Sequence, residues 1–462
     1  MARSTALRQR SRSNREAPRL STATWLTLLV VAMCGVGVII VFSASSVISM
    51  SLYGNAFSIG MKEVIWMVLG AIFFVITSRT DYNRWRYFAV IGLVGTMGLL
   101  VMVLVPGVGV TSGGSSRWIG ISWIRIQPSE LMKLALAIFG ADLIARRQQE
   151  GCTNRQLIGP LAIVAGTAAA LVIKQPDLGT AMVLMVITIT LLFAAGIPGV
   201  LLAKGIGVVT ALVTIAAFAM PYRRERLLSF VDPGSKADGS GYQVVQSLIG
   251  LGSGHLFGLG LGGSREKWGL LPNAHTDFIF SIIGEELGLI AVLGVLVLLS
   301  VFVFKGLKSA DLSSDRFGAL LGVSLVTWIA SEALINIGAV IGVLPVTGIP
   351  LPFISFGGSS LVITMAAAGM LVSIARRGTE GTLAPAKAPR RAAKKATGRK
   401  SPVRKTPARS STSSKAHTRT PATARSAAPR ARASGTTPHA SRRRATTAAR
   451  GPASPFRQPR PK

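Results

Sequence analysis

The chain has 462 residues, of which 49% are hydrophobic and 15% are charged, and its mean hydropathy is +0.49. This composition excludes an ordinary soluble globular protein and indicates a polytopic membrane protein. The two cysteines, Cys34 and Cys152, are too few for a disulfide framework or a thiolate metal site.

The formal net charge of +33 is carried mainly by the two ends of the chain. Residues 1–20 contain six Arg and one Glu, and residues 381–462 contain 22 Lys and Arg with no Asp or Glu. We expect a basic cytoplasmic N-terminal tail and a disordered basic cytoplasmic C-terminal tail. The second tail is either a solvated tether or a binding segment for anionic lipid, nucleic acid or an acidic cytoplasmic partner.

Apolar windows long enough to cross a bilayer follow one another through residues 21–380. We therefore predict an all-α, polytopic membrane domain of about ten transmembrane helices. The windows lie near residues 24–47, 61–78, 87–105, 128–145, 157–173, 178–196, 198–220, 277–304, 317–344 and 353–375.

Lys and Arg gather in alternate connections between these windows, which the positive-inside rule assigns to the cytoplasm together with both termini. Four other connections then open on the outer face, and the largest is the extracytoplasmic loop 221–276 between the seventh and eighth helices. Their Trp, Arg, Gln and Asp residues among Gly and Pro are typical of a shaped site. The other three outer connections are 106–127, 174–177 and 344–352.

Two acidic positions have a structural interpretation beside a functional one. Glu130 and Lys133 lie one helical turn apart, so we predict a buried structural ion pair rather than catalysis. Asp177 follows a Lys-Gln-Pro sequence that starts at Lys174. It either caps the next helix or contacts a substrate or a metal ion.

Asp277 stands beside His275 where the large loop enters the eighth predicted helix. A helix N-cap would explain the aspartate alone, but the loop before it also carries several cations. Cations beside a carboxylate suit a diphosphate-bearing substrate, with the carboxylate acting as a general base. Residues 258–263 are predicted to add backbone N–H donors to this anion site. The loop cations are Arg223, Arg224, Arg226, Arg265 and Lys267.

These segments together resemble the SEDS family of cell-wall polymerases (shape, elongation, division and sporulation). The sequence at residues 222–226 is more similar to the division branch of that family than to its elongation branch. Four residues depart from the usual family pattern: Asn273, His255, Glu332 and Phe356. The resemblance is carried by residues 43–45, 117–119, 127–133, 174–180, 222–226, 241–248, 272–280, 284–288 and 344–360.

The resemblance implies a peptidoglycan glycosyltransferase of the bacterial plasma membrane. Such an enzyme polymerises lipid II, the undecaprenyl-diphosphate-linked disaccharide-peptide, with inversion at the anomeric carbon during septal wall synthesis. It places the family's essential loop aspartate at Asp277. With the cationic loop, it predicts substrate contacts by Arg117, Trp118, Lys174, Asp177, Arg223, Arg226, Gln243, Arg265, Lys267 and His275.

The implied partners are a class B penicillin-binding transpeptidase and other division proteins. No spacing of His, Cys, Asp or Glu marks a metal site, although a divalent cation, Mg²⁺ or Mn²⁺, would suit diphosphate chemistry. Three alternatives are a lipid II flippase or transporter, a polymerase of the lateral wall, and a non-catalytic division scaffold that uses the basic tail.

Overall fold

The computed structural model describes residues 20–112, 115–121, 124–218 and 241–383. Both predicted basic tails lie almost entirely outside the described residues, as do Arg223, Arg224 and Arg226. The last described helix continues to Leu383, a little past the predicted domain boundary at residue 380.

Seven helices in this described part are long and apolar enough to cross a membrane, and α7 and α8 are shorter apolar helices. With α5, these helices coincide with the ten predicted windows and confirm the all-α membrane fold. They are α2 (Thr22–Tyr53), α3 (Ser58–Arg79), η1 with α4 (Tyr82–Phe88 and Ala89–Val103), α5 (Pro128–Gln149), α6 (Asn154–Lys174), α7 (Leu178–Ala194), α8 (Gly199–Phe218), α11 (Ile279–Asp311), α12 (Arg316–Val340) and α13 (Ser359–Leu383).

Side-chain caps and a proline define several helix starts. Ser21 accepts the N–H of Thr24 at the start of α2, and Asp315 accepts the N–H of Gly318 at the start of α12. Pro128 occupies the first turn of α5, where a missing N–H is harmless. The predicted spans therefore begin where the local sequence favours a helix start.

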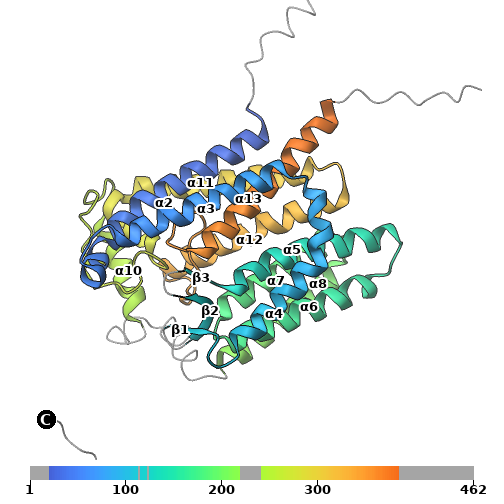
Figure 1. Ribbon diagram of the computed structural model, residues 1–462, viewed down its shortest axis with the longest axis horizontal. Coiled ribbons are helices and arrows are strands. Elements are labelled where there is room, and N and C mark those ends of the chain that lie inside the picture. The colour runs from blue at the N-terminus through green and yellow to red at the C-terminus, as the bar shows by residue number, and fades with distance from the viewer. Residues whose placement is uncertain (1–19, 113–114, 122–123, 219–240, 384–462) are drawn as a thin grey trace, which may run out of the picture. The chain divides into compact units, whose positions relative to one another are not determined.

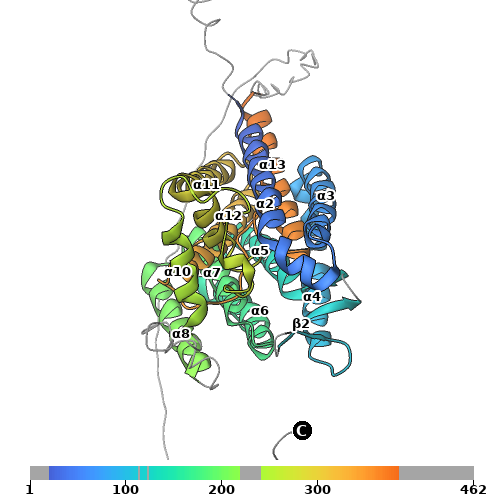
Figure 2. The ribbon, with the colours of Figure 1, turned by 90° about the vertical axis from the view of Figure 1, so that its left-hand side faces the viewer.

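The centre of the bundle is α13, which lies between α3 and α12 (Figure 2). In its most apolar window 94% of the residues are buried, against 22% in the corresponding window of α11. Small residues allow α13 and α3 to approach closely. A Cβ on Gly369 would collide with Thr77, whose hydroxyl donates to the carbonyl of Ala366 at 2.9 Å.

The connections predicted to face outward gather at one end of the bundle, on the left in Figure 1. This end, called the sheet end below, carries an antiparallel sheet of β1 (Val110–Ser112), β2 (Ser115–Ile121) and β3 (Ile124–Ile126). It also carries α10 (Tyr242–Ser253) and the short helix η3 (Glu266–Trp268). The start of α2 and the end of α13 lie at the opposite end. Neither the sheet nor α10 was predicted.

Candidate active site

Asp277 follows a tight turn that begins at Asn273. Asn273 has a φ of 59°, a left-handed conformation that Asn tolerates better than most residues, and its carbonyl accepts the N–H groups of Thr276 and Asp277 at 3.1 Å. The N-cap of α11 is Phe278, one residue after the aspartate. The half-buried Asp277 is therefore not placed as the helix cap, which was the structural interpretation of this residue.

The structure brings the Asp277 carboxylate and the Arg117 guanidinium together at Gly348. A Cβ built on Gly348 would lie 3.7 Å from Oδ2 of Asp277 and 3.9 Å from Nη1 of Arg117. The glycine has a φ of 76°, so another residue there would be strained as well as crowded. A carboxylate, a guanidinium and a bare backbone surface thus converge from the turn before α11, from β2 and from the 344–352 connection.

The rest of the Arg117 guanidinium fixes the sheet to the bundle. Its Nε donates to the carbonyl of Gln175 at 3.2 Å, and its Nη2 donates to the carbonyl of Pro176. These carbonyls belong to the turn between α6 and α7. Because two of its nitrogens bind this turn, the remaining Nη1 is held in a defined direction, toward Gly348.

Asn336 of α12 is a site residue that the sequence analysis missed. Its side chain is only 2% exposed, and its Nδ2 donates to the carbonyl of Asp277 at 2.8 Å and to that of Ile349 at 2.7 Å. One side-chain amide therefore holds both the aspartate and the connection that contains Gly348. The only signal in the sequence is a polar residue inside an apolar helix, one turn after Glu332.

His275 is not a source of positive charge at neutral pH. Burial lowers the pKa of its imidazole to about 4, so the ring is uncharged above that pH. The ring packs against Phe356 with 5.7 Å between the centroids, and the His275 carbonyl accepts the N–H of Phe356 at 3.1 Å. The predicted substrate contact of His275 would therefore be that of a neutral hydrogen-bonding group.

Asp177 acts as a helix cap, as one of its two interpretations predicted. Its carboxylate accepts the N–H of Thr180 at 3.1 Å, the hydroxyl of Thr180 at 2.8 Å and the side-chain amide of Gln127 at 3.1 Å. The aspartate is buried beneath these partners. We therefore omit it from the proposed substrate contacts, whereas the neighbouring Lys174 is exposed at the end of α6.

One cation of the predicted loop, Lys267, is paired inside the protein. The buried Nζ of Lys267 donates to the carbonyl of Gly262 at 2.6 Å and to Oε1 of Glu286 at 3.2 Å. Ser43 of α2 donates to the same carboxylate at 2.6 and 2.7 Å. Because Lys267 is neutralised inside the protein, we also omit it from the proposed substrate contacts.

The glycine-rich segment 258–263 does not form the predicted anion site. The N–H groups of Leu259 and Gly260 donate to the carbonyls of Glu285 and Glu286, each at 2.9 Å. The N–H of Gly262 donates to the hydroxyl of Ser43 at 3.1 Å. These donors serve the fold, so that prediction was wrong.

Glu266 is a buried carboxyl group at the sheet end with an unusual pKa. Its Oε2 has no hydrogen-bond partner within the described residues, and both Glu266 and Glu285 approach Gly250. Burial first, and the neighbouring Glu285 second, raise the pKa of Glu266 to about 7.

A pH-dependent stability follows from this shift. In the unfolded chain Glu266 titrates near 4.5, so between that pH and about 7 the folded state holds the extra proton. The free energy of unfolding should fall as the pH rises through this window and level off above it. We expect Glu266→Gln to flatten this part of a thermal-unfolding profile measured in detergent. If the free energy of unfolding fell with pH as steeply in the variant as in the wild type, the assignment would be contradicted.

The predicted ion pair between Glu130 and Lys133 is confirmed at 2.7 Å, and it has a third member. Lys133 also pairs with Glu332 of α12, and its Nζ lies 5.2 Å from the centroid of the Trp328 ring. Ser360 of α13 donates to Glu130 at 2.9 Å. The triad of Glu130, Lys133 and Glu332 thus joins α5 to α12 in the interior of the bundle, and Ser360 links it to α13.

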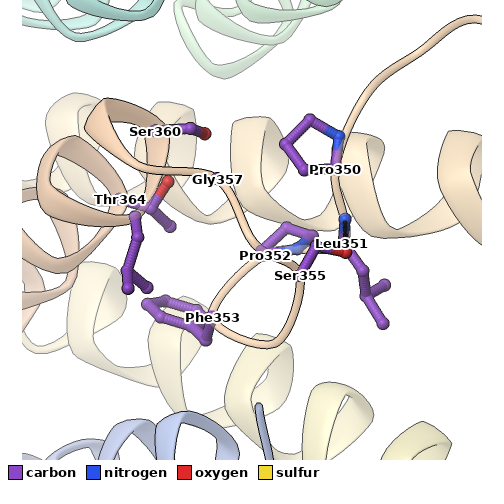
Figure 3. A pocket seen from close by; sticks show the side chains of 9 residues that line it. Pro350, Leu351, Pro352, Phe353, Ser355, Gly357, Ser360 and Thr364 are labelled. Carbon is purple, nitrogen blue, oxygen red and sulfur yellow. Dashed lines mark hydrogen bonds between the residues drawn. The ribbon is translucent and has the colours of Figure 1, made fainter. Parts of the chain in front are cut away.

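A small pocket lies between the 344–352 connection and the start of α13 (Figure 3). Ser360, the partner of Glu130, is one of its lining residues, so the pocket adjoins the buried triad. Figure 3 shows the hydroxyls of Ser360 and Thr364 on one side and Pro350 and Pro352 on the other. Among the described residues, no group of three His, Cys, Asp or Glu side chains has the geometry of a metal site.

The other predicted contact residues lie at the sheet end on different elements. Trp118 follows Arg117 in β2, Gln243 lies in the first turn of α10, and Arg265 is exposed beside η3. The structure thus brings Arg117 and Asp277 to the same glycine, Gly348. The remaining contacts stay predictions.

Comparison with known proteins gives a consistent result over the membrane domain. Residues 24–380 match the FtsW, RodA and SpoVE family of cell cycle proteins. A probable peptidoglycan glycosyltransferase FtsW from Geobacter metallireducens is 36% identical over 352 residues, which cover 76% of this chain and 94% of the relative. The corresponding protein of Mycobacterium tuberculosis is 39% identical over 378 residues, covering 82% and 72%. Stage V sporulation protein E of Bacillus subtilis is 37% identical over 356 residues, covering 76% and 96%.

Solved structures have the same fold. A chain from a peptidoglycan synthase complex that coordinates polymerization and crosslinking superposes with a TM-score of 0.63 at 25% identity, covering 76% of this chain and 97% of that one. The rod shape determining protein RodA of Thermus thermophilus superposes with a TM-score of 0.57 at 25% identity, covering 76% and 95%.

Proposed function

Since this chain belongs to the FtsW, RodA and SpoVE family of cell cycle proteins, we propose that it is a peptidoglycan glycosyltransferase that polymerises lipid II. The observation that carries the proposal is the meeting of the Asp277 carboxylate and the Arg117 guanidinium at Gly348. The sheet end is then the outer face of the membrane, and both termini are cytoplasmic. The product is a β-1,4 glycan strand, and undecaprenyl diphosphate is released.

The geometry suits an inverting displacement. Asp277 takes the proton of the acceptor 4-hydroxyl while that oxygen attacks the anomeric carbon of the donor. The bond between this carbon and the diphosphate oxygen breaks, and the diphosphate leaves with the bonding electron pair. A guanidinium stabilises the charge that develops on the diphosphate, and the guanidinium of Arg117 lies near the base at Gly348.

We assign the activity to septal wall synthesis because two of the relatives are FtsW proteins at 36% and 39% identity. The sporulation relative at 37% identity shows that this assignment needs its own test. The likeness to a chain of a synthase complex supports a cross-linking transpeptidase of class B as partner. Depleting the protein in its host should then block septation before it alters the side wall.

Purified protein and labelled lipid II provide the direct test of polymerisation. We expect glycan ladders on a gel that a muramidase digests, in reactions without any other synthase. A flippase is the second candidate, because Glu63 and Glu332 are carboxylates buried inside spans. A flippase would move lipid II across the membrane of vesicles and would form no glycan ladder. Parallel reactions with EDTA, Mg²⁺ and Mn²⁺ determine whether a divalent cation assists.

Asn336→Leu should lower kcat for glycan formation by about 10- to 100-fold, because a misplacement of about 1 Å at a reacting group costs that much. The variant removes the amide that donates to the carbonyls of Asp277 and Ile349. KM for lipid II should change little, since Asn336 is buried behind the site. Steady-state kinetics measure both constants.

A matched control separates positioning from stability. Ser331→Leu changes a half-buried polar side chain on the same helix that donates only to the carbonyl of Trp328. It should leave kcat near the wild-type value at equal thermal stability. An Asn336→Leu enzyme that keeps its kcat would show that the amide does not position Asp277.

A further inference from the structure

Helix α11 is interrupted near the sheet end. Gly288 has a φ of 76° and a ψ of −175°, which lie outside any helical conformation. Such a break leaves backbone N–H and carbonyl groups without their partners in the helix. Inside or beside a bilayer these groups must be satisfied by protein, because hydrocarbon offers no hydrogen bonds.

A segment of the large loop satisfies them, and we call residues 255–261 the strap. The N–H groups of Leu259 and Gly260 in the strap donate to the carbonyls of Glu285 and Glu286, each at 2.9 Å. In return the N–H of Leu289 donates to the carbonyl of His255 at 2.9 Å. The strap therefore lies against α11 at the level of residues 285–290.

The length of α11 places this level relative to the membrane. Its 33 residues exceed the roughly 20 that cross the hydrocarbon core, about 30 Å at 1.5 Å per residue. Lys305 and Lys308 mark the opposite end of the apolar stretch. Counting about 20 residues back from Lys305 reaches Glu285, so the strap lies at the hydrocarbon boundary of the sheet end.

Apart from His255, which is also exposed, the exposed side chains of the strap are apolar. Phe257 is 78% exposed, and Leu256, Leu259 and Leu261 are exposed as well. Between residues 256 and 264 the sequence has no ionisable side chain. This surface continues onto the exposed Leu289, Ile290 and Leu293 of α11 below it. Left in water, such a surface would cost about 25 cal/mol for each Å² of apolar area.

We propose that the strap is immersed in the outer leaflet, where the acyl chains of membrane phospholipids cover Phe257 and its leucines. Continuity with the lipid-facing side of α11 and the depth of the strap favour lipid over a protein partner as the occupant. Trp268 at the end of η3, also exposed, marks the interface above the strap. The strap thus anchors the start of α11, and with it Asp277, to the membrane surface.

Site-directed fluorescence in liposomes of the purified full chain tests the strap without any catalytic measurement. A Cys34→Ala, Cys152→Ser background carries a single Phe257→Cys substitution labelled with an environment-sensitive fluorophore. Leu261→Cys is the second site, in case the first variant folds poorly. Val297→Cys on the exposed side of α11 is the lipid-facing reference, and Ser51→Cys at the end of α2 is the aqueous reference.

Phospholipids with a nitroxide near the headgroup should quench the strap label by at least half. Phospholipids with a nitroxide at the end of the acyl chain should quench the strap label less. At Val297 the chain-end nitroxide should quench more strongly than the headgroup nitroxide. Iodide in the buffer should have little effect on the strap label and a strong effect at Ser51. A strap label quenched by iodide would overturn the proposal in favour of water. A label protected from both quenchers would overturn it in favour of a protein cover, such as a second copy of the chain.

Discussion

Replacing Asp277 with asparagine should lower kcat for glycan formation by about 10²- to 10⁴-fold, the usual contribution of a general base. Asparagine has nearly the same shape but cannot accept the proton of the acceptor hydroxyl at neutral pH. The side chain is only half-buried and does not cap α11, so the variant should fold normally. Polymerisation of labelled lipid II and a thermal-unfolding curve measure the two effects separately.

Two further substitutions sharpen this test. Asp311→Asn removes an exposed carboxylate from the far end of α11 and should leave kcat unchanged. Asp277→Glu keeps the charge but moves it by one methylene group, so it should retain part of the activity. An Asp277→Asn enzyme that keeps more than about a tenth of the wild-type kcat would exclude Asp277 as the base. Such an enzyme would still be a polymerase.

The transmembrane helices could be predicted because their signal is local. The length of each apolar stretch can be read from the sequence alone. Even α5, which contains Glu130 and Lys133, therefore matched a predicted window. The sheet could not be predicted in this way. Two of its strands have only three residues, and the third contains Gly120 at a φ of 149°, so no long alternation of apolar and polar residues marks them.

The residues of the candidate site also divide into those that a local pattern indicates and those whose contacts depend on packing. Local patterns were sufficient for the ion pair of Glu130 and Lys133. At Asp177 they gave the helix cap as one of two interpretations, and the structure has the cap. The sequence around Lys267 does not indicate that Glu286, on another element, neutralises it. Likewise nothing near Asn336 in the sequence indicates that its amide reaches Asp277 and Ile349, because those contacts depend on the packing of α12.

Two of the departures from the family pattern have a physical explanation in the structure. His255 and Asn273 both adopt a positive φ, of 46° and 59°. Asn and His are among the residues that tolerate this conformation when glycine is absent. Glu332 is different, because it adds a second carboxylate to the Lys133 ammonium in the interior of the bundle.

Replacing Lys133 with methionine should lower the free energy of unfolding by about 3–5 kcal/mol, the usual cost of removing one partner from a buried ion pair. The methionine fills most of the space of the lysine stem but leaves Glu130 and Glu332 buried together without a cation. The resulting loss of thermal stability, measured in detergent, should greatly exceed that of Lys308→Met. Lys308 is exposed at the end of α11 and provides the matched control.

Removing all three charges distinguishes electrostatics from packing. With Glu130→Gln and Glu332→Gln added to Lys133→Met, no charge remains at the triad, and most of the lost stability should return. Glu332→Gln alone keeps one carboxylate for one ammonium and should be nearly neutral, because Lys133 retains its 2.7 Å bond to Glu130. If the triple variant were as unstable as Lys133→Met, the triad would stabilise the bundle through its shape.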